Sequence, residues 1–289
     1  MVKQRYFAAF VVAALVAAAP AAAQHSLVQA GAAPTRIVSL SPTATEDLFA
    51  IGAGKQVVAV DNQSNYPASA PKTKLSGYTP NAEAVAAYRP DLVVVSFDAN
   101  HIVESLGKLK IPVLVEPTAA TLAQAYGQLT ALGKATGHIS GAGAVVATMK
   151  KQLAAIVAST PHGSPPVTVY DELEPDLYSV TSRTFIGRLF TMLGLKDIAD
   201  AADKTGSGYP QLSQEYVVVA DPQLIVLADT ICCKQSQATL DKRAGWGTIA
   251  AIKNGGVLAV DDDVASRWGP RVVDFVRAVA AKVKEIEKK

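Results

Sequence analysis

Two stretches of this chain repeat one pattern at a distance of 132 residues. The first, EAVAAYRPDLVVV, begins at Glu83, and the second, EYVVVADPQLIVL, begins at Glu215. Each is typical of a short helix, a proline that ends it, and an apolar strand covered on both faces. We therefore expect an internal duplication, with two lobes built on the same α/β plan.

An amphipathic stretch lies between the two repeats. Its apolar residues recur at steps of three and four, which predicts one buried stripe on a helix from Ser140 to Ser159. The stripe comprises Ala142, Val145, Val146, Met149, Leu153, Ile156 and Val157. Twenty residues at ~1.5 Å each give a rod of ~30 Å, long enough to cross a small domain. We interpret residues 139–160 as a stiff helix connecting a lobe at 35–138 to a lobe at 161–289.

Strands alternate with helices on both sides of this connector. We expect strands at 36–40, 56–60, 91–96, 111–115, 167–170, 177–180, 224–227 and 256–260, with helices between most of them. This alternation indicates parallel sheets, and ligands of such proteins bind outside the carboxyl ends of the strands. The predicted fold is α/β, with two Rossmann-like lobes and a ligand cleft between them.

The first 23 residues resemble a secretory signal peptide. Lys3 and Arg5 precede an apolar run, and Ala21–Ala23 suit a cleavage site near Ala23. No cysteine stands near this cut, so we expect no lipobox and a periplasmic protein, with 24–34 as a flexible leader. Without Lys3 and Arg5 the chain has 25 basic and 25 acidic residues. A neutral chain argues against nucleic acid as a partner.

The two cysteines, Cys232 and Cys233, are adjacent. Neighbouring cysteines cannot join distant segments, and a metal site needs more ligands than this pair supplies. They either form a vicinal disulfide or remain thiols. The repeat aligns them with the loop after strand 91–96, so a vicinal disulfide would be an apolar plate on the cleft wall.

Longer motifs resemble a known family. The segments RIVSLSPTATEDLFAIG, NAEAVAAYRPDLVVVS, YPQLSQEYVVVADPQLIVLAD and DDDVASRWGPRVVD are similar, in this order, to periplasmic binding proteins for cobalamin and iron complexes. The likeness is greatest to the cobalamin-binding component. It implies two lobes joined by one rigid helix, capture of a bulky metal-centred ligand, and delivery to an ABC transporter permease, with no resident cofactor and a monomeric state.

The resemblance also implies ligand-binding residues in loops and at strand ends. These candidates are Tyr66, Tyr78, Phe97, Tyr178, Tyr209, Arg267 and Trp268. Aromatic faces bury a large area at low entropic cost, which suits a corrin, a porphyrin or a catechol. Phe97 and Tyr178 could instead belong to the core, and Arg267 could be an ordinary surface residue.

Permease docking is expected to involve acidic residues. Glu83 stands where the family has a glutamate that pairs with permease arginines. The C-terminal position that we aligned with a second docking acid holds Ser266. Either the acidic run from Asp261 to Asp263 supplies this charge, with Asp262 and Asp263 as the candidates, or docking is asymmetric.

Other functions remain open at this point. A hydrolase with Cys232 as nucleophile and His101 as base is conceivable, although no signature supports it. If the ligand is haem, Tyr78, Tyr209 or His101 could be an axial ligand, with His101 a weak candidate. Cobalamin is the favoured ligand, with ferric siderophores and haem as alternatives.

Overall fold

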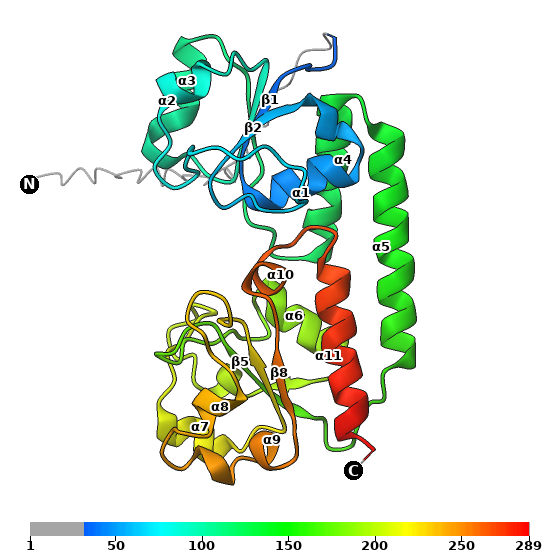
Figure 1. Cartoon of the computed structure of the whole chain (residues 1–289). Helices are drawn as coiled ribbons and strands as arrows, with labels where there is room; N and C mark the ends of the chain where they lie inside the picture. Colours follow the sequence, from blue (N-terminus) through cyan, green and yellow to red (C-terminus); the bar gives the residue numbers. More distant parts are fainter. Residues whose placement is uncertain (1–31, 289) are drawn as a thin grey trace, which may run out of the picture.

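The computed structural model describes residues 32–288 and consists of two lobes beside one long helix (Figure 1). The N-terminal lobe contains β1 (Ile37–Leu40), α1 (Pro42–Ala50), η1 (Ala53–Gln56), β2 (Val57–Val60), α2 (Ala82–Ala86), β3 (Leu92–Val95), η2 (Ala99–His101), α3 (Ile102–Lys108), β4 (Val113–Val115) and α4 (Leu122–Thr136). The long helix is α5 (Ile139–Ser159).

The C-terminal lobe begins with β5. It contains β5 (Thr168–Glu172), α6 (Phe185–Met192), β6 (Lys196–Asp197), η3 (Ile198–Ala201), α7 (Gln214–Ala220), β7 (Leu224–Leu227), α8 (Gln237–Leu240), η4 (Trp246–Thr248), α9 (Ala250–Lys253), β8 (Val257–Ala259), α10 (Asp262–Ser266) and α11 (Val272–Ile286).

The two sheets have the same strand order. They run β2-β1-β3-β4 and β6-β5-β7-β8, and all six strand pairs are parallel. The repeated stretches become α2 with β3 and α7 with β7, at equivalent places in the two sheets. The duplication expected from the sequence is therefore matched by the topology. In this order the chain reverses direction across the sheet between β1 and β3, and between β5 and β7, which places a ligand crevice outside their carboxyl ends.

The connecting helix α5 packs against both lobes. It contacts α4 and α1 on the N-terminal side and α11 on the C-terminal side. Its residue Gly141 passes so close to α1 that a Cβ atom there would lie 2.0 Å from the carbonyl oxygen of Ile51. Figure 1 shows α5 and α11 side by side along the C-terminal lobe.

A single apolar core runs through both lobes along these helices. It includes Leu48 and Leu132 from the first lobe, Leu153 of α5, and Phe190 and Val279 from the second. Separate smaller cores cover the other face of each sheet. Because the largest core is shared, we expect the two lobes to resist wide hinge motion.

Several details differ from the sequence prediction. The strand predicted at 177–180 is only an isolated bridge between Tyr178 and Gln211. The short elements β6 and α10 were not predicted, because two or five mostly polar residues carry little periodic signal. The predicted signal peptide and most of the leader lie outside the described residues. Within residues 32–288, no helix combines the length and the apolar character needed to cross a membrane.

Candidate functional site

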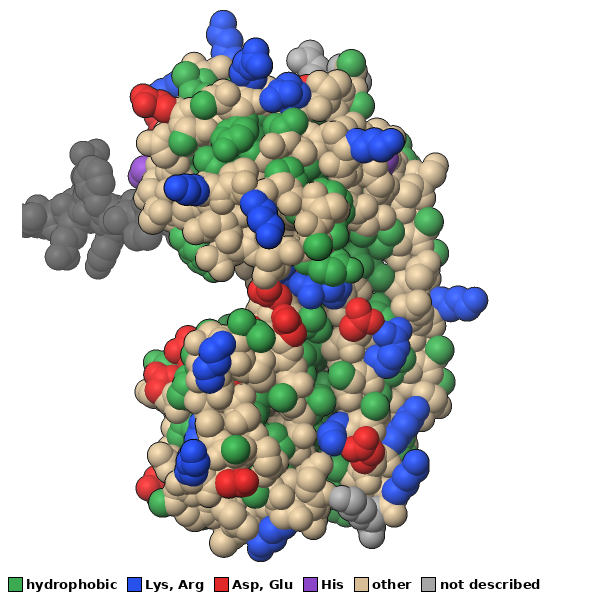
Figure 2. Space-filling view, viewed as in Figure 1, with side chains coloured by type: hydrophobic (Ala, Val, Ile, Leu, Met, Phe, Trp, Pro, Cys, Tyr) green, Lys and Arg blue, Asp and Glu red, His purple; other side chains and the backbone are tan. Residues whose placement is uncertain are grey.

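A cleft separates the lobes on the side away from α5 (Figure 2). Because both sheets are parallel, the loops that follow β1, β2 and β3 share one edge of the N-terminal sheet, and those that follow β5, β7 and β8 share one edge of the C-terminal sheet. Direct contacts mark the place where the walls meet, since Asn65 of the first lobe bonds Asp263 of the second. The cleft therefore lies at the strand ends, as the repeat predicted.

Tyr78 and Phe97 form an aromatic pair on the N-terminal wall. Their ring centres are 6.0 Å apart with the planes tilted by 50°. Tyr78 is 71% exposed and Phe97 is also largely open. The loop bearing Tyr78 passes over the end of β1 at Gly77, where a Cβ atom would lie 2.6 Å from the carbonyl oxygen of Leu40. Phe97 is therefore a surface residue and not part of the core.

Tyr178 and Tyr209 lie on neighbouring segments of the C-terminal lobe. Tyr178 bridges Gln211, and the backbone N–H of Ser179 donates to the carbonyl of Pro210, so the segments that carry the two tyrosines run side by side. Both rings are partly exposed. Each lobe thus contributes two accessible aromatic side chains near its strand ends.

Tyr66 is fixed by an arginine from the opposite lobe. The guanidinium carbon of Arg271 lies 4.3 Å from the centre of the Tyr66 ring. Arg271 also donates from Nε and Nη2 to the two carboxylate oxygens of Glu46, at 2.8 and 2.5 Å. These bonds raise the pKa of Arg271. A guanidinium on one face leaves the other face of Tyr66, which is 47% exposed, for another contact.

Arg267 joins the lobes and does not offer a free guanidinium to the cleft. Its Nη1 donates to Oε1 of Glu46 at 2.7 Å and to Oδ1 of Asn65 at 3.0 Å. Its Nη2 donates to the carbonyl of Gln63 at 2.9 Å and lies 2.6 Å from Oδ1 of Asp263. The side chain is only 6% exposed. Our expectation that Arg267 contacts the ligand does not fit this geometry.

Trp268 is likewise a lobe–lobe contact. Its Nε1 donates to Oε1 of Gln128 in α4 at 2.7 Å, and its half-buried ring packs on the shared core. Sequence reasoning did not single out Glu46 or Arg271, which organise this junction. A sequence signal for Glu46 was its position within the helical segment TEDLF, on the face that the helix buries, because a buried carboxylate needs a partner.

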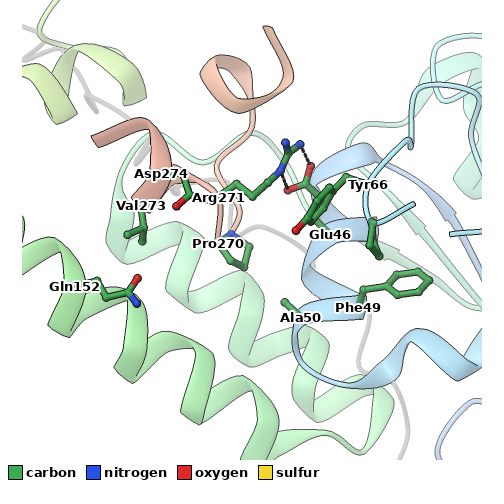
Figure 3. A pocket seen from close by; sticks show the side chains of 10 residues that line it. Glu46, Phe49, Ala50, Tyr66, Gln152, Pro270, Arg271, Val273 and Asp274 are labelled. Atoms are coloured by element: carbon green, nitrogen blue, oxygen red, sulfur yellow. Dashed lines mark hydrogen bonds and ion pairs between the residues drawn. The ribbon is translucent and has the colours of Figure 1, made fainter. Parts of the chain in front are cut away.

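A pocket lies beside the junction (Figure 3). Its volume is about 420 Å³, and α1, α5 and the start of α11 enclose it. Tyr66, Arg271 and Glu46 form one wall, with Phe49 and Gln152 among the other lining residues.

Cys232 and Cys233 are joined by a disulfide in the loop after β7. Asp262 holds this loop: its carboxylate accepts the backbone N–H groups of Ile231 and Cys232, both at 2.8 Å, and the hydroxyl of Thr230 at 3.1 Å. Burial raises the pKa of Asp262, but these donors together lower it below its ordinary value.

The acidic residues expected to dock a permease fall into two groups. Asp262 is occupied by the cysteine loop, and Asp263 by Arg267 and Asn65, so neither fits a docking role. Glu83 is exposed in the first turn of α2. Glu215 occupies the same place in the first turn of α7 and is exposed as well. Figure 1 shows both helices on the side of their lobes away from α5.

Several carboxyl groups at the strand ends are buried. Burial raises the pKa of Glu116, which follows β4, to about 7. Burial also raises the pKa of Asp197 to about 7, and burial together with Glu172 has the same effect on Asp229. These groups are therefore largely uncharged in mildly acidic solution.

His101 is exposed at the end of η2. Within the described part of the chain, no group of three or more His, Cys, Asp and Glu side chains is arranged to hold a metal ion.

Residues 37–264 match the family of periplasmic binding proteins, and the chain belongs to this family. An uncharacterised ABC transporter substrate-binding lipoprotein of Bacillus subtilis is 32% identical over 259 residues, which cover 86% of this chain and 80% of that protein. A cobalamin-binding protein of Halobacterium salinarum is 31% identical over 267 residues, or 89% of this chain and 72% of that protein.

The solved structures agree on the fold. The periplasmic vitamin B12-binding protein of Vibrio cholerae superposes with a TM-score of 0.71 at 24% identity, covering 89% of this chain and 99% of that one. The family and the two-lobe α/β fold predicted from the sequence are thereby confirmed.

Proposed function

We propose that this protein captures cobalamin, or a closely related corrinoid, outside the cytoplasm and delivers it to the permease of an ABC transporter. The observation that carries the proposal is the aromatic cleft, with Tyr78 and Phe97 on one wall and Tyr178 and Tyr209 on the other. Two such walls suit a wide, flat ligand with two accessible faces. The cobalamin-binding relative at 31% identity supports the same ligand.

Four arginines of the C-terminal lobe are paired with carboxylates, which favours a ligand that needs no free guanidinium. Arg183 pairs with Asp203, Arg243 with Glu172, and Arg267 and Arg271 with Glu46. Carboxylates of haem or of a ferric siderophore are usually held by guanidinium groups free to make charged hydrogen bonds. A corrin carries its side chains mainly as uncharged amides, which need no such partner.

Docking to the permease is proposed at Glu83 and Glu215. Both glutamates are exposed and hold equivalent positions on α2 and α7. We therefore expect the two lobes to make similar contacts with the permease. Replacing either by alanine should leave ligand affinity unchanged while weakening ligand-dependent stimulation of the transporter ATPase. A loss of ligand affinity would instead place these residues in the cleft.

Calorimetric titration of the mature protein with cyanocobalamin, haemin and ferrichrome tests the ligand. We expect one saturable site for cyanocobalamin and weaker or no binding of the other two. Tight haemin binding that is lost in Tyr78→Phe or Tyr209→Phe would favour the haem alternative, because a phenolate is a known axial ligand.

A cysteine hydrolase is the alternative from another class. The Cys232 sulfur is bonded to Cys233, so it is not a thiolate nucleophile in this state. Ester hydrolysis that disappears in Cys232→Ala, without binding of any of the three ligands, would favour the enzyme.

A further inference from the structure

The loop after β7 exposes apolar groups at the cleft. Ile231 is 58% exposed, and Cys232 next to it is exposed as well. Cys233 is half-buried, so the disulfide presents one edge to solvent and rests on the lobe with the other. An isoleucine and a disulfide together form a compact, polarisable surface, of the kind that packs well on a conjugated ring.

This loop is the counterpart of the aromatic loop in the other lobe. Val95 ends β3 two residues before Phe97, and Leu227 ends β7 two residues before Asp229, at equivalent positions in the two sheets. The cysteine pair therefore follows β7 as the segment containing His101 follows β3. The next strand end leads directly into α10, where Asp263 contacts Asn65 of the N-terminal lobe. The short helix α10 therefore contacts both the cysteine loop, through Asp262, and the N-terminal lobe, through Asp263.

The loop is held in one conformation from two sides. Asp262 accepts three hydrogen bonds from Thr230, Ile231 and Cys232, as described above. On the other side, the carbonyl of Asp229 accepts the N–H groups of Cys233 and Gln235, both at 3.3 Å. A surface fixed in this way loses little conformational entropy when a ligand covers it.

Global stability does not account for the disulfide. A disulfide stabilises a fold mainly by closing a long loop of the unfolded chain, and a bond between adjacent residues closes almost none. Its effect must be local, on the shape of the loop that contains it.

We propose that Ile231 and the Cys232–Cys233 disulfide form an apolar contact site for one side of a conjugated, ring-shaped ligand, and that Asp262 is the positioning residue that holds this site. The inference rests on the proposed function, because it assigns the ligand to the same cleft. The exposed rings of Tyr78 and Phe97 would serve the opposite side of the ligand.

The test compares the oxidised and reduced protein. Dithiothreitol supplies two electrons and two protons, the S–S bond is replaced by two thiols, and the reagent leaves as its cyclic disulfide. We expect reduction, or the double change Cys232→Ala and Cys233→Ala, to weaken cyanocobalamin binding about tenfold, a loss typical of removing one important contact from a binding interface. Saturating cyanocobalamin should also slow the reduction severalfold, because the ligand covers the bond. A purely structural disulfide would show no such protection.

Asp262 is tested beside its neighbour Asp261. Asp262→Ala should speed the reduction of the disulfide and weaken cyanocobalamin binding. Asp262→Asn keeps an acceptor oxygen, so its reduction rate and its affinity should both lie between those of the wild type and Asp262→Ala. Asp261 caps α10 through the N–H groups of Asp263 and Val264 and accepts no bond from the cysteine loop in the structure, so Asp261→Ala is the matched control. Equal effects of the two alanine changes would overturn the positioning role.

The outcomes separate the two proposals. If cyanocobalamin fails to bind but haemin binds with the same dependence on the disulfide, the proposed ligand is wrong and the contact site stands. Binding of ferrichrome alone overturns both proposals, because ferrichrome has no conjugated ring. If cyanocobalamin binds equally well before and after reduction, with no protection, the contact site is wrong and the function stands. Binding of none of the three probes overturns both.

Discussion

The guanidinium of Arg271, from the C-terminal lobe, stacks 4.3 Å from the centre of the Tyr66 ring, from the N-terminal lobe. The same guanidinium forms a two-pronged ion pair with Glu46, which is itself 2% exposed at the side chain. Tyr66, which we expected to touch the ligand, is therefore held by Arg271, and Arg271 also joins the two lobes through Glu46. The ion pair that orients Arg271 against Tyr66, a candidate binding residue, is therefore also one of the contacts between the two lobes.

The Glu46 junction should dominate the stability of the lobe interface. Glu46→Gln removes the carboxylate that pairs with the half-buried Arg271 and one of the two carboxylates that pair with the buried Arg267, and breaking a buried ion pair costs about 3–5 kcal/mol. Urea unfolding followed by circular dichroism measures this change. Glu104→Gln removes an equally close but exposed pair with Lys108 and should have no measurable effect. Similar midpoints for the two variants would contradict a structural role for the junction.

Two glycines of α5 should respond in opposite directions to alanine. At Gly141 a Cβ atom would meet the carbonyl oxygen of Ile51, so Gly141→Ala must displace α5 from α1 and lose stability, by about 1–3 kcal/mol. At Gly143 nothing lies within 4 Å, and Gly143→Ala should gain about 0.5–1 kcal/mol from helix propensity. Thermal melting of the two variants decides the point; stabilisation by Gly141→Ala would mean that α5 does not approach α1 so closely.

Burial of Glu116 predicts an unusual dependence of stability on pH. Its pKa is raised from 4.5 to about 7, so the folded state holds a proton that the unfolded state releases at lower pH. The favourable contribution is complete below about 4.5, falls as pH rises, and is lost above about 7, a loss of roughly 3 kcal/mol.

Glu116→Gln cannot ionise and should remove this share of the pH dependence. We expect the free energy of unfolding of the variant, measured in urea at pH 5, 6, 7 and 8, to fall less steeply than that of the wild type. Parallel curves would show that Glu116 titrates normally.

The aromatic pair on the N-terminal wall should act as one unit in binding. Tyr78→Ala and Phe97→Ala should each weaken cyanocobalamin binding by about 5- to 30-fold. The double variant should lose less than the sum of the free-energy changes, because the rings touch each other. Ile139→Ala, at an exposed position at the start of α5, is the control and should bind normally. Additive losses would indicate that the two rings contact the ligand independently.

The sequence was a good guide to the architecture and a poorer guide to the site. Periodicity located α5 to within one residue and the repeat located β3 and β7, because long apolar patterns reflect a buried face directly. The sequence also predicted the exposed aromatic residues, because an aromatic residue in a loop rich in glycine and proline at a strand end is usually not part of the core.

The roles of the charged residues were not predictable in the same way. Arg267, Asp262 and Asp263 are close to each other in sequence, yet their partners Glu46, Asn65 and Ile231 come from distant segments. No local pattern distinguishes an arginine that faces a ligand from one that joins two lobes. The distinction depends on tertiary distances, which a single sequence does not contain.

Because the described chain passes from one lobe to the other only through α5, each wall of the cleft is encoded by one uninterrupted stretch of sequence. A single genetic crossover within α5 could therefore exchange one complete wall, with its sheet and its aromatic residues, for that of a relative. The ion pairs of Glu46 would then decide which combinations of halves fit together. In a fold of this kind, new ligand preferences can arise by recombining whole walls as well as by changing single residues.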